Sequence, residues 1–142
     1  MAFKCSTELR VRLPETDAMG VVFHGSFFTY FDVARMDYIR NLGLLPRYLT
    51  GEGTNLIVHT SADFRAPARF EDLLVVRTRI SKLGRSSLAF ELRVEQKHDG
   101  SLVAEGGSVH VMVDSKTRRP VPVPEDLRQA VRAFEGSALA ES

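Results

Sequence analysis

An aspartate and a histidine stand close together just ahead of the most apolar helix-like stretch of the chain. Asp17 and His24 flank a glycine, Gly20, and the residues that follow, 26–42, have helical periodicity. The first turn of a helix presents backbone N–H groups without partners and the positive end of the helix dipole. A carboxylate beside that end is suited to catalysis, so Asp17 is the first residue whose chemistry we consider.

The element that must position this pair is the helix itself. Its apolar side chains recur at three- and four-residue steps and extend most of the way round the cylinder, so we expect it to lie inside the protein. Ser26 is the expected N-cap, and Gly43 stands where a glycine commonly ends a helix. The apolar positions are Phe27, Phe28, Phe31, Val33, Ala34, Tyr38, Ile39 and Leu42.

Length and composition favour one soluble domain. A chain of 142 residues can bury a sizeable core, and a net charge of +1 with dispersed charges does not suggest a nucleic-acid or membrane-surface protein. The single cysteine, Cys5, excludes an internal disulfide framework and a multi-cysteine zinc site. Residues 1–15 lack the apolar core of a signal peptide, and no apolar run approaches the ~20 residues of a membrane span. We expect a cytoplasmic protein.

Alternation of apolar and polar residues predicts five strands. The first covers residues 3–13, ahead of the helix, and four more runs follow it, at 56–64, 74–80, 88–95 and 102–113. One face of the second strand is expected to carry Leu56, Val58, Thr60, Ala62 and Phe64, and one face of the last to carry Val109, Val111 and Val113. Charged residues expected to face outward are Arg77, Arg79, Glu91, Arg93 and Glu95.

The C-terminal part of the sequence differs from these strands. Its prolines exclude a central strand, a short helix is expected over 124–134, and residues 136–142 are expected to fray. The order of strand, long helix and four antiparallel strands predicts a single α+β domain over residues 1–142. In it, one long central helix is wrapped by a five-stranded antiparallel sheet.

Several short motifs resemble those of one protein family. The run Asp17-Ala18-Met19-Gly20-Val21-Val22-Phe23-His24 is similar to the signature of hot-dog-fold acyl-CoA thioesterases of the 4-hydroxybenzoyl-CoA thioesterase group, which includes the Tol–Pal-associated thioesterases. Further landmarks follow in family order: Asp63-Phe64-Arg65-Ala66-Pro67, Asp72, Leu83-Gly84-Arg85-Ser86-Ser87, Gly100, Val103-Ala104-Glu105-Gly106 and Pro122-Val123-Pro124. The resemblance covers residues 5–125.

The resemblance implies a hydrolase that splits an acyl- or aroyl-CoA thioester into a free acid and coenzyme A. It assigns Asp17 as a nucleophile or as the general base for water, and a backbone N–H at or near His24 as the donor to the oxyanion. Gly20 would give the turn its backbone freedom and leave room for the acyl group. The side chain of His24 would orient water or Asp17 and would not act as the base.

The resemblance also implies where coenzyme A binds. Arg85-Ser86-Ser87 matches the family region that contacts the coenzyme's phosphates, and Arg65 and Arg69 are further candidates. Phe27 stands where many relatives carry a tyrosine, which leaves the acyl preference open. No cofactor is expected, because the coenzyme is the substrate. No metal site is expected either, because His59, His98 and His110 show no ligand spacing.

The family joins two subunits into one continuous sheet with the sites at their interface, so the resemblance implies a homodimer at minimum and favours a homotetramer. The charged outer face favours pairing of strand edges as the primary interface. Two other functions stay open: a hot-dog hydroxyacyl-thioester dehydratase, and a non-catalytic acyl-thioester-binding protein. A triad of Ser26, His24 and Asp32 is rejected, because the sequence has no nucleophile elbow.

Overall fold

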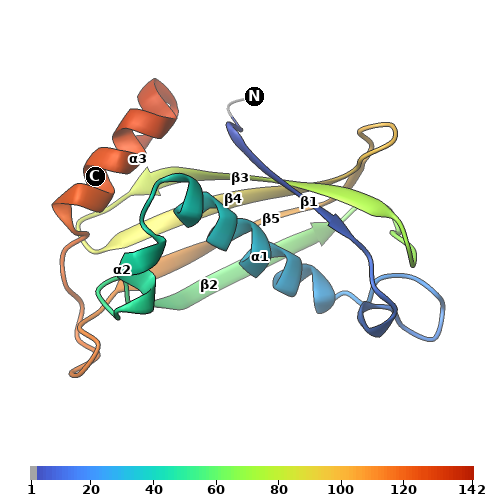
Figure 1. Cartoon of the computed structure of the whole chain (residues 1–142), viewed down its shortest axis with the longest axis horizontal. Helices are drawn as coiled ribbons and strands as arrows, with labels where there is room; N and C mark the ends of the chain where they lie inside the picture. The colour runs from blue at the N-terminus through green and yellow to red at the C-terminus, as the bar shows by residue number, and fades with distance from the viewer. Residues whose placement is uncertain (1–2) are drawn as a thin grey trace.

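One antiparallel sheet and one long helix account for most of the regular structure (Figure 1). The computed structural model describes residues 3–142. The strands are β1 (Cys5–Arg10), β2 (Asn55–Phe64), β3 (Leu73–Leu83), β4 (Ser87–Gln96), β5 (Leu102–Met112) and β6 (Ala140–Glu141). The α-helices are α1 (Ser26–Asn41), α2 (Leu45–Leu49) and α3 (Glu125–Glu135), and short 3-10 turns lie at Leu13–Glu15 and Gly136–Ala138.

The sheet has the strand order β1-β3-β4-β5-β2, and all these neighbours pair antiparallel. The predicted α+β class is therefore confirmed. The sheet of residues 3–142 has six strands where five were predicted, because β6 pairs in parallel with the end of β3. In place of the fraying expected for residues 136–142, the chain forms a 3-10 turn and this short strand, since the N–H of Ser142 donates to the carbonyl of Leu83 at 3.1 Å.

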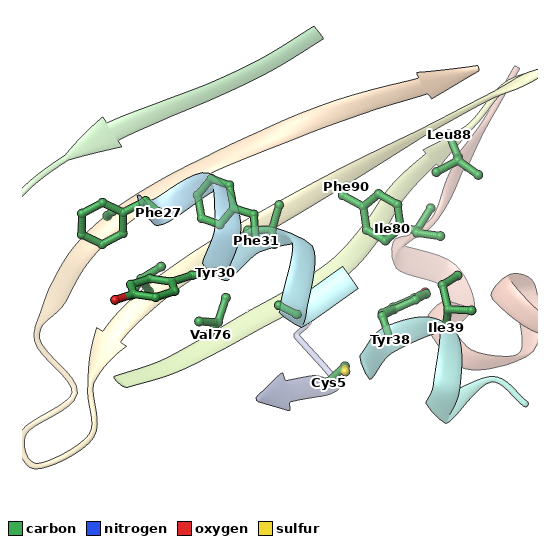
Figure 2. Packing of buried hydrophobic residues seen from close by; sticks show 14 of the residues in the cluster. Cys5, Phe27, Tyr30, Phe31, Tyr38, Ile39, Val76, Ile80, Leu88 and Phe90 are labelled. Carbon is green, nitrogen blue, oxygen red and sulfur yellow. The ribbon is translucent and has the colours of Figure 1, made fainter. Parts of the chain in front are cut away.

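Helix α1 lies across one face of the sheet, and the core forms between the two (Figure 1). Aromatic side chains fill this layer along the whole helix, from Phe27 and Tyr30 at its start to Tyr38 near its end (Figure 2). Val33 is 44% exposed, so the helix is not enclosed on every side as its apolar sequence suggested. No helix of residues 3–142 combines the length and hydrophobicity that crossing a bilayer requires.

The ends of α1 follow partly from the sequence. Gly43 has a φ of +75° just beyond the helix, which confirms its place as the terminating glycine. Ser26 is the first helical residue and Gly25 is the N-cap, so the prediction that Ser26 caps the helix was wrong. The Ser26 hydroxyl instead donates to the backbone carbonyl of Glu15 at 3.0 Å.

A β-bulge changes the faces predicted for β2. The pairing register shifts between Ile57, opposite His110, and His59, opposite Val109, which leaves Val58 without a partner on β5. Directly opposed residues in an antiparallel pair share a face. Leu56 therefore shares the outer face with Val111, while the later residues Thr60, Ala62 and Phe64 lie on the helix face. The single alternating face predicted from Leu56 to Phe64 was wrong at this bulge.

The outer face of the sheet is charged at one end and apolar at the other. The predicted outward residues pair with one another: Arg77 with Glu95 at 3.0 Å, Arg79 with Glu91 at 2.7 Å, and Arg93 with Glu95 at 2.6 Å. In the second half of β5, the buried residues Ser108, His110 and Met112 alternate with Val109 and Val111, which therefore point away from the helix.

Strand β2 forms one edge of the sheet and is the most exposed of the long strands. Leu56, Ile57 and Val58 are 40%, 48% and 60% exposed. An edge strand with free backbone groups and apolar side chains is suited to pairing with another strand.

Candidate functional site

Asp17 begins a tight turn ahead of α1. The N–H of Asp17 donates to the carbonyl of Val21 at 2.9 Å, and the N–H of Gly20 donates to the carbonyl of Asp17 at 3.0 Å. Gly20 has a φ of +78°, a conformation that residues with a side chain rarely adopt. A Cβ at Gly20 would meet nothing within 4 Å, so the turn requires this glycine for its backbone angle and not for space.

The two oxygens of the Asp17 carboxylate have different surroundings. Oδ1 accepts a hydrogen bond from the N–H of Met19 at 2.8 Å and a longer one from Val21 at 3.5 Å. No hydrogen bond found among residues 3–142 involves Oδ2. One oxygen thus fixes the side chain, and the other is available to a ligand or to water.

The start of α1 offers two backbone donors close to this turn. The N–H groups of Ser26, Phe27 and Phe28 donate to carbonyls within the first turn, and that of Phe23 donates to Glu15 at 2.9 Å. Within the described residues, the N–H groups of His24 and Gly25 have no such acceptor. Free N–H groups at a helix N-terminus favour negative charge.

A cleft of about 420 Å³ joins these features. Its wall combines the turn, the start of α1 and the segment that follows β2. The lining residues are Asp17, Val22, His24, Phe27, Phe64, Arg65, Ala66, Pro67 and Ala68. The two segments are held together because the N–H of Val22 donates to the carbonyl of Ala68 at 2.8 Å.

Four of the predicted site residues meet in this cleft: Asp17, His24, Phe27 and Arg65. The ring of Phe27 lies 5.5 Å from that of Phe64, and the His24 ring lies 6.4 Å from Phe64. Arg65 is partly held by Glu105 at 3.6 Å and by Asp63 at 4.0 Å. The cleft therefore has an aromatic wall, one carboxylate and one cation.

Of the other predicted residues, Gly20 lies in the Asp17 turn, and Arg85, Ser86 and Ser87 lie elsewhere. Arg85 and Ser86 lie in the turn between β3 and β4, and Ser87 begins β4, whereas the cleft lies near the start of β3, where the backbone carbonyl of Asp72 accepts the N–H of Val11. The eleven residues of β3 separate these two ends by about 33 Å at ~3.3 Å per residue. Figure 1 shows the β3–β4 turn beside α3 and the loop between β1 and α1 at the opposite end. Within one chain, these residues do not meet Asp17.

Sequence reasoning missed a polar cluster beneath the Asp17 turn. Glu15 is 7% exposed and accepts hydrogen bonds from Arg12 and from the hydroxyl of Tyr30. Burial alone would raise the pKa of Glu15, but the bonds from Arg12 and Tyr30 outweigh it and hold the pKa below its usual value. Burial and the Glu15 carboxylate raise the pKa of Tyr30. The available signal was the tyrosine on the buried side of α1, since a buried phenol needs a hydrogen-bond partner.

A second polar chain, also not predicted, lies under the middle of α1. Ser108 Oγ and His110 Nε2 are 2.8 Å apart, His110 Nδ1 and Asn55 Oδ1 are 2.8 Å apart, and Arg35 donates to Ser108 at 3.3 Å. Burial, with a smaller contribution from Arg35, lowers the pKa of His110 to about 4. Ser108 and His110 are 2% and 4% exposed and line none of the hollows described for residues 3–142. This chain supports the core and not the cleft.

The three residues of the rejected triad are not hydrogen-bonded to one another among the described residues. Ser26 bonds the Glu15 carbonyl and Asp32 bonds Arg35, so neither is joined to His24. Among residues 3–142, no group of three histidine, cysteine, aspartate or glutamate side chains is arranged to hold a metal ion.

Comparison with known proteins gives the class of this fold and then the family. A structure of a thioesterase from Thermus thermophilus complexed with coenzyme A and Zn is similar, with a TM-score of 0.84, 32% identity, and coverage of 95% of this chain and 96% of that one. The model of the thioesterase-like superfamily matches residues 11–131. The chain belongs to this superfamily of hot-dog proteins.

Two curated relatives extend the comparison. The acyl-CoA thioesterase YbgC of Haemophilus influenzae is 32% identical over 128 residues, which cover 88% of this chain and 92% of the relative. The 1,4-dihydroxy-2-naphthoyl-CoA hydrolase of Synechococcus elongatus is 29% identical over 121 residues, which cover 83% of this chain and 88% of the relative. The likeness thus spans nearly the whole length of each protein.

Proposed function

We propose that this protein hydrolyses acyl-CoA thioesters and that Asp17 supplies the catalytic carboxylate. Thioester hydrolysis is the activity named for similar proteins, and the family is thioesterase-like. One observation carries the residue assignment: the cleft brings a carboxylate with a free oxygen beside a helix start with two free N–H groups. That pairing supplies both a base or nucleophile and an oxyanion site.

The chemistry can follow either of two balanced routes. As a general base, Asp17 takes a proton from water while the water oxygen bonds to the carbonyl carbon; the C–S bond then breaks, and the proton leaves with the coenzyme thiolate. As a nucleophile, Asp17 bonds to that carbon, expels the thiolate, and forms a mixed anhydride that water then hydrolyses. In both routes negative charge develops on the carbonyl oxygen. The N–H groups of His24 and Gly25 would stabilise it.

The side chains of the cleft wall determine which acyl groups the cleft can accept. Phe27 and Phe64 offer aromatic faces beside Asp17, and such faces accept flat aromatic groups as well as alkyl chains. One similar protein is named for an acyl-CoA and another for a naphthoyl-CoA substrate. The imidazole of His24 is exposed and has no hydrogen bond within the described residues, so it is free to orient water near Asp17.

Coenzyme binding requires a second subunit in this proposal. The turn at Arg85, Ser86 and Ser87 lies at the far end of the sheet from Asp17 in its own chain. Pairing two β2 edges about a two-fold axis reverses one sheet relative to the other, which brings the partner subunit's β3–β4 turn to the Asp17 end. Three strand spacings from the chain's own β2, across the junction, to the partner's β4 amount to about 14 Å at ~4.8 Å each. An extended coenzyme can bridge such a gap, with Arg65 along its path.

The assembly proposed is a homodimer through the β2 edges, and a homotetramer and a cytoplasmic location stay predictions from the sequence. Exposed apolar side chains on β2 and the charged outer face both favour the edge. With the site shared between subunits, activity would belong to the oligomer.

A thiol-release assay tests the proposed function. The protein is incubated with a set of saturated, hydroxyacyl and aroyl-CoA thioesters, and free coenzyme thiol is followed with a chromogenic disulfide. We expect turnover of at least one thioester with release of the free acid. Loss of water from a hydroxyacyl-CoA without thiol release would identify a dehydratase. Binding of acyl-CoA without either reaction would identify a binding protein.

A further inference from the structure

We infer that Glu15 is a positioning residue that fixes the Asp17 turn against the start of α1. The inference deepens the proposed function and rests on it. Glu15 lies two residues before Asp17, in the 3-10 turn Leu13–Glu15, and its side chain does not line the cleft. It acts through the parts that do.

The backbone of Glu15 ties down the far side of the loop. Its carbonyl accepts the N–H of Phe23 at 2.9 Å and the hydroxyl of Ser26 at 3.0 Å. Phe23 immediately precedes His24, and Ser26 immediately follows Gly25. The two free N–H groups of the helix start are therefore bracketed by bonds to this one carbonyl.

The side chain of Glu15 ties down the near side of the loop. Oε1 accepts the backbone N–H of Arg12 at 2.8 Å and the hydroxyl of Tyr30 at 2.9 Å. Oε2 accepts the Arg12 guanidinium, from Nε at 2.6 Å and from a terminal nitrogen at 2.5 Å. Tyr30 is 2% exposed on α1, one turn after Ser26, so its bond links the helix body to the 3-10 turn that leads into Asp17.

Together these contacts set the spacing between the carboxylate and the oxyanion donors. The chain leaves Glu15, passes through Asp17 and returns to Glu15 at Phe23 and Ser26, so the turn is a closed loop with its ends joined at one residue. Because a displacement of about 1 Å in a reacting group can lower a rate ~10²-fold, an anchor at that junction acts on turnover. Substrate affinity depends on the cleft wall, which Glu15 does not form.

The test compares isosteric variants at this anchor with a matched variant elsewhere. Tyr30→Phe removes one hydroxyl that bonds Glu15, and Thr7→Val removes one hydroxyl that bonds Asp37 at 2.7 Å, between β1 and a later turn of α1. Both lose one hydrogen bond between α1 and the segment before it. Glu15→Gln is the second anchor variant, since its amide turns a donor toward the Arg12 guanidinium. For each variant, kcat and KM are measured at a temperature well below its thermal unfolding transition, and the melting temperature is measured separately.

We expect Tyr30→Phe to lower kcat about three- to tenfold and Glu15→Gln about ten- to a hundredfold, with KM within threefold of the parent. Thr7→Val should keep kcat within twofold even where its melting temperature falls as much as that of Tyr30→Phe. Parent-like kcat in both anchor variants, or a loss matched by Thr7→Val at equal destabilisation, overturns the inference. Asp17→Asn is assayed in parallel: if it is inactive while the anchor variants are normal, only the inference fails, and if it is fully active, the proposed mechanism itself fails.

Discussion

Two carboxylates of the same loop differ sharply in how they are engaged. Glu15 is buried and uses both oxygens in hydrogen bonds, while Asp17 is exposed, and only its Oδ1 is bonded among the described residues. A fully bonded carboxylate is a structural group, whereas one with a free oxygen beside helix N–H groups can take part in a reaction. The difference in surroundings explains why two acids only two positions apart receive different roles.

Asp17→Asn tests the catalytic carboxylate directly. The amide nearly matches the acid in shape and keeps an oxygen that can accept the N–H of Met19, so the turn should persist. An amide is neither a base nor a useful nucleophile, so kcat should fall by at least ~10²–10⁴-fold. Steady-state kinetics with the best thioester, together with circular dichroism to check folding, measure the effect. Turnover at the parent rate in a folded Asp17→Asn protein contradicts the mechanism.

At the scale of elements, the periodicity of the sequence was enough to predict the long helix and the long strands. The 3.6-residue pattern located α1, alternation located the long strands, and Gly43 marked the helix end. The bulge at Val58 was not predictable, because an extra residue in one strand becomes visible only when the partner strand is paired with it. The Glu15 anchor was missed for the same reason, since its bond to Tyr30 joins residues 15 positions apart in sequence.

The predicted site residues also divide into those placed by local sequence and those placed by contacts distant in the sequence. Motif spacing brought Asp17, His24 and Phe27 to the start of one helix, where local sequence decides position. Arg65 joined them because β2 ends beside that start. The turn at Arg85 belongs to a different end of the sheet, and only a partner subunit can bring such a turn near the cleft. Sequence spacing contains no information on that symmetry.

The buried chain under α1 gives a prediction for pH and stability. The pKa of His110 is lowered from 6.5 to about 4, so the folded state keeps the imidazole neutral where the unfolded chain would protonate it. Unfolding therefore takes up a proton between these values, and stability should fall as the pH drops from 6.5 toward 4 and then level off. The largest contribution is about 3 kcal/mol. Burial is the main cause of the lowered pKa, and the positive charge of Arg35 lowers it further.

Urea denaturation at several pH values measures this effect. The parent protein is compared with His110→Gln, which does not titrate in this range but can still contact Ser108 or Asn55. We expect the variant to be less stable at pH 7 and to have a weaker pH dependence between pH 6.5 and 4. If the two unfolding free energies change in parallel over that interval, His110 is not the group responsible.

At the scale of the whole molecule, the coenzyme prediction tests whether two subunits share a site. Loss of one charged partner of a phosphate costs about 1.5–3 kcal/mol, so Arg85→Ala should raise KM about ten- to a hundredfold. The value of kcat should change little, because the phosphates lie far from the reacting carbon. Arg118→Ala, at an exposed arginine in the loop after β5, is the matched control. A loss of kcat at unchanged KM would show that Arg85 does not contact the phosphates.

The same architecture predicts that assembly and activity are lost together. Val58 is 60% exposed at the β2 bulge, and Leu49 is 78% exposed on α2, so Val58→Lys and Leu49→Lys make a similar chemical change on the edge strand and on the short helix that precedes it in the chain. Charged residues on an edge strand oppose strand pairing. We expect light scattering to find a dimer or tetramer at micromolar concentration for the parent and for Leu49→Lys, and a shift toward monomer for Val58→Lys. Thioesterase activity should fall in proportion to the monomer fraction, because each cleft would lack the partner's coenzyme-binding turn. A monomeric Val58→Lys protein with the parent's kcat and KM would mean that each chain carries a complete site of its own.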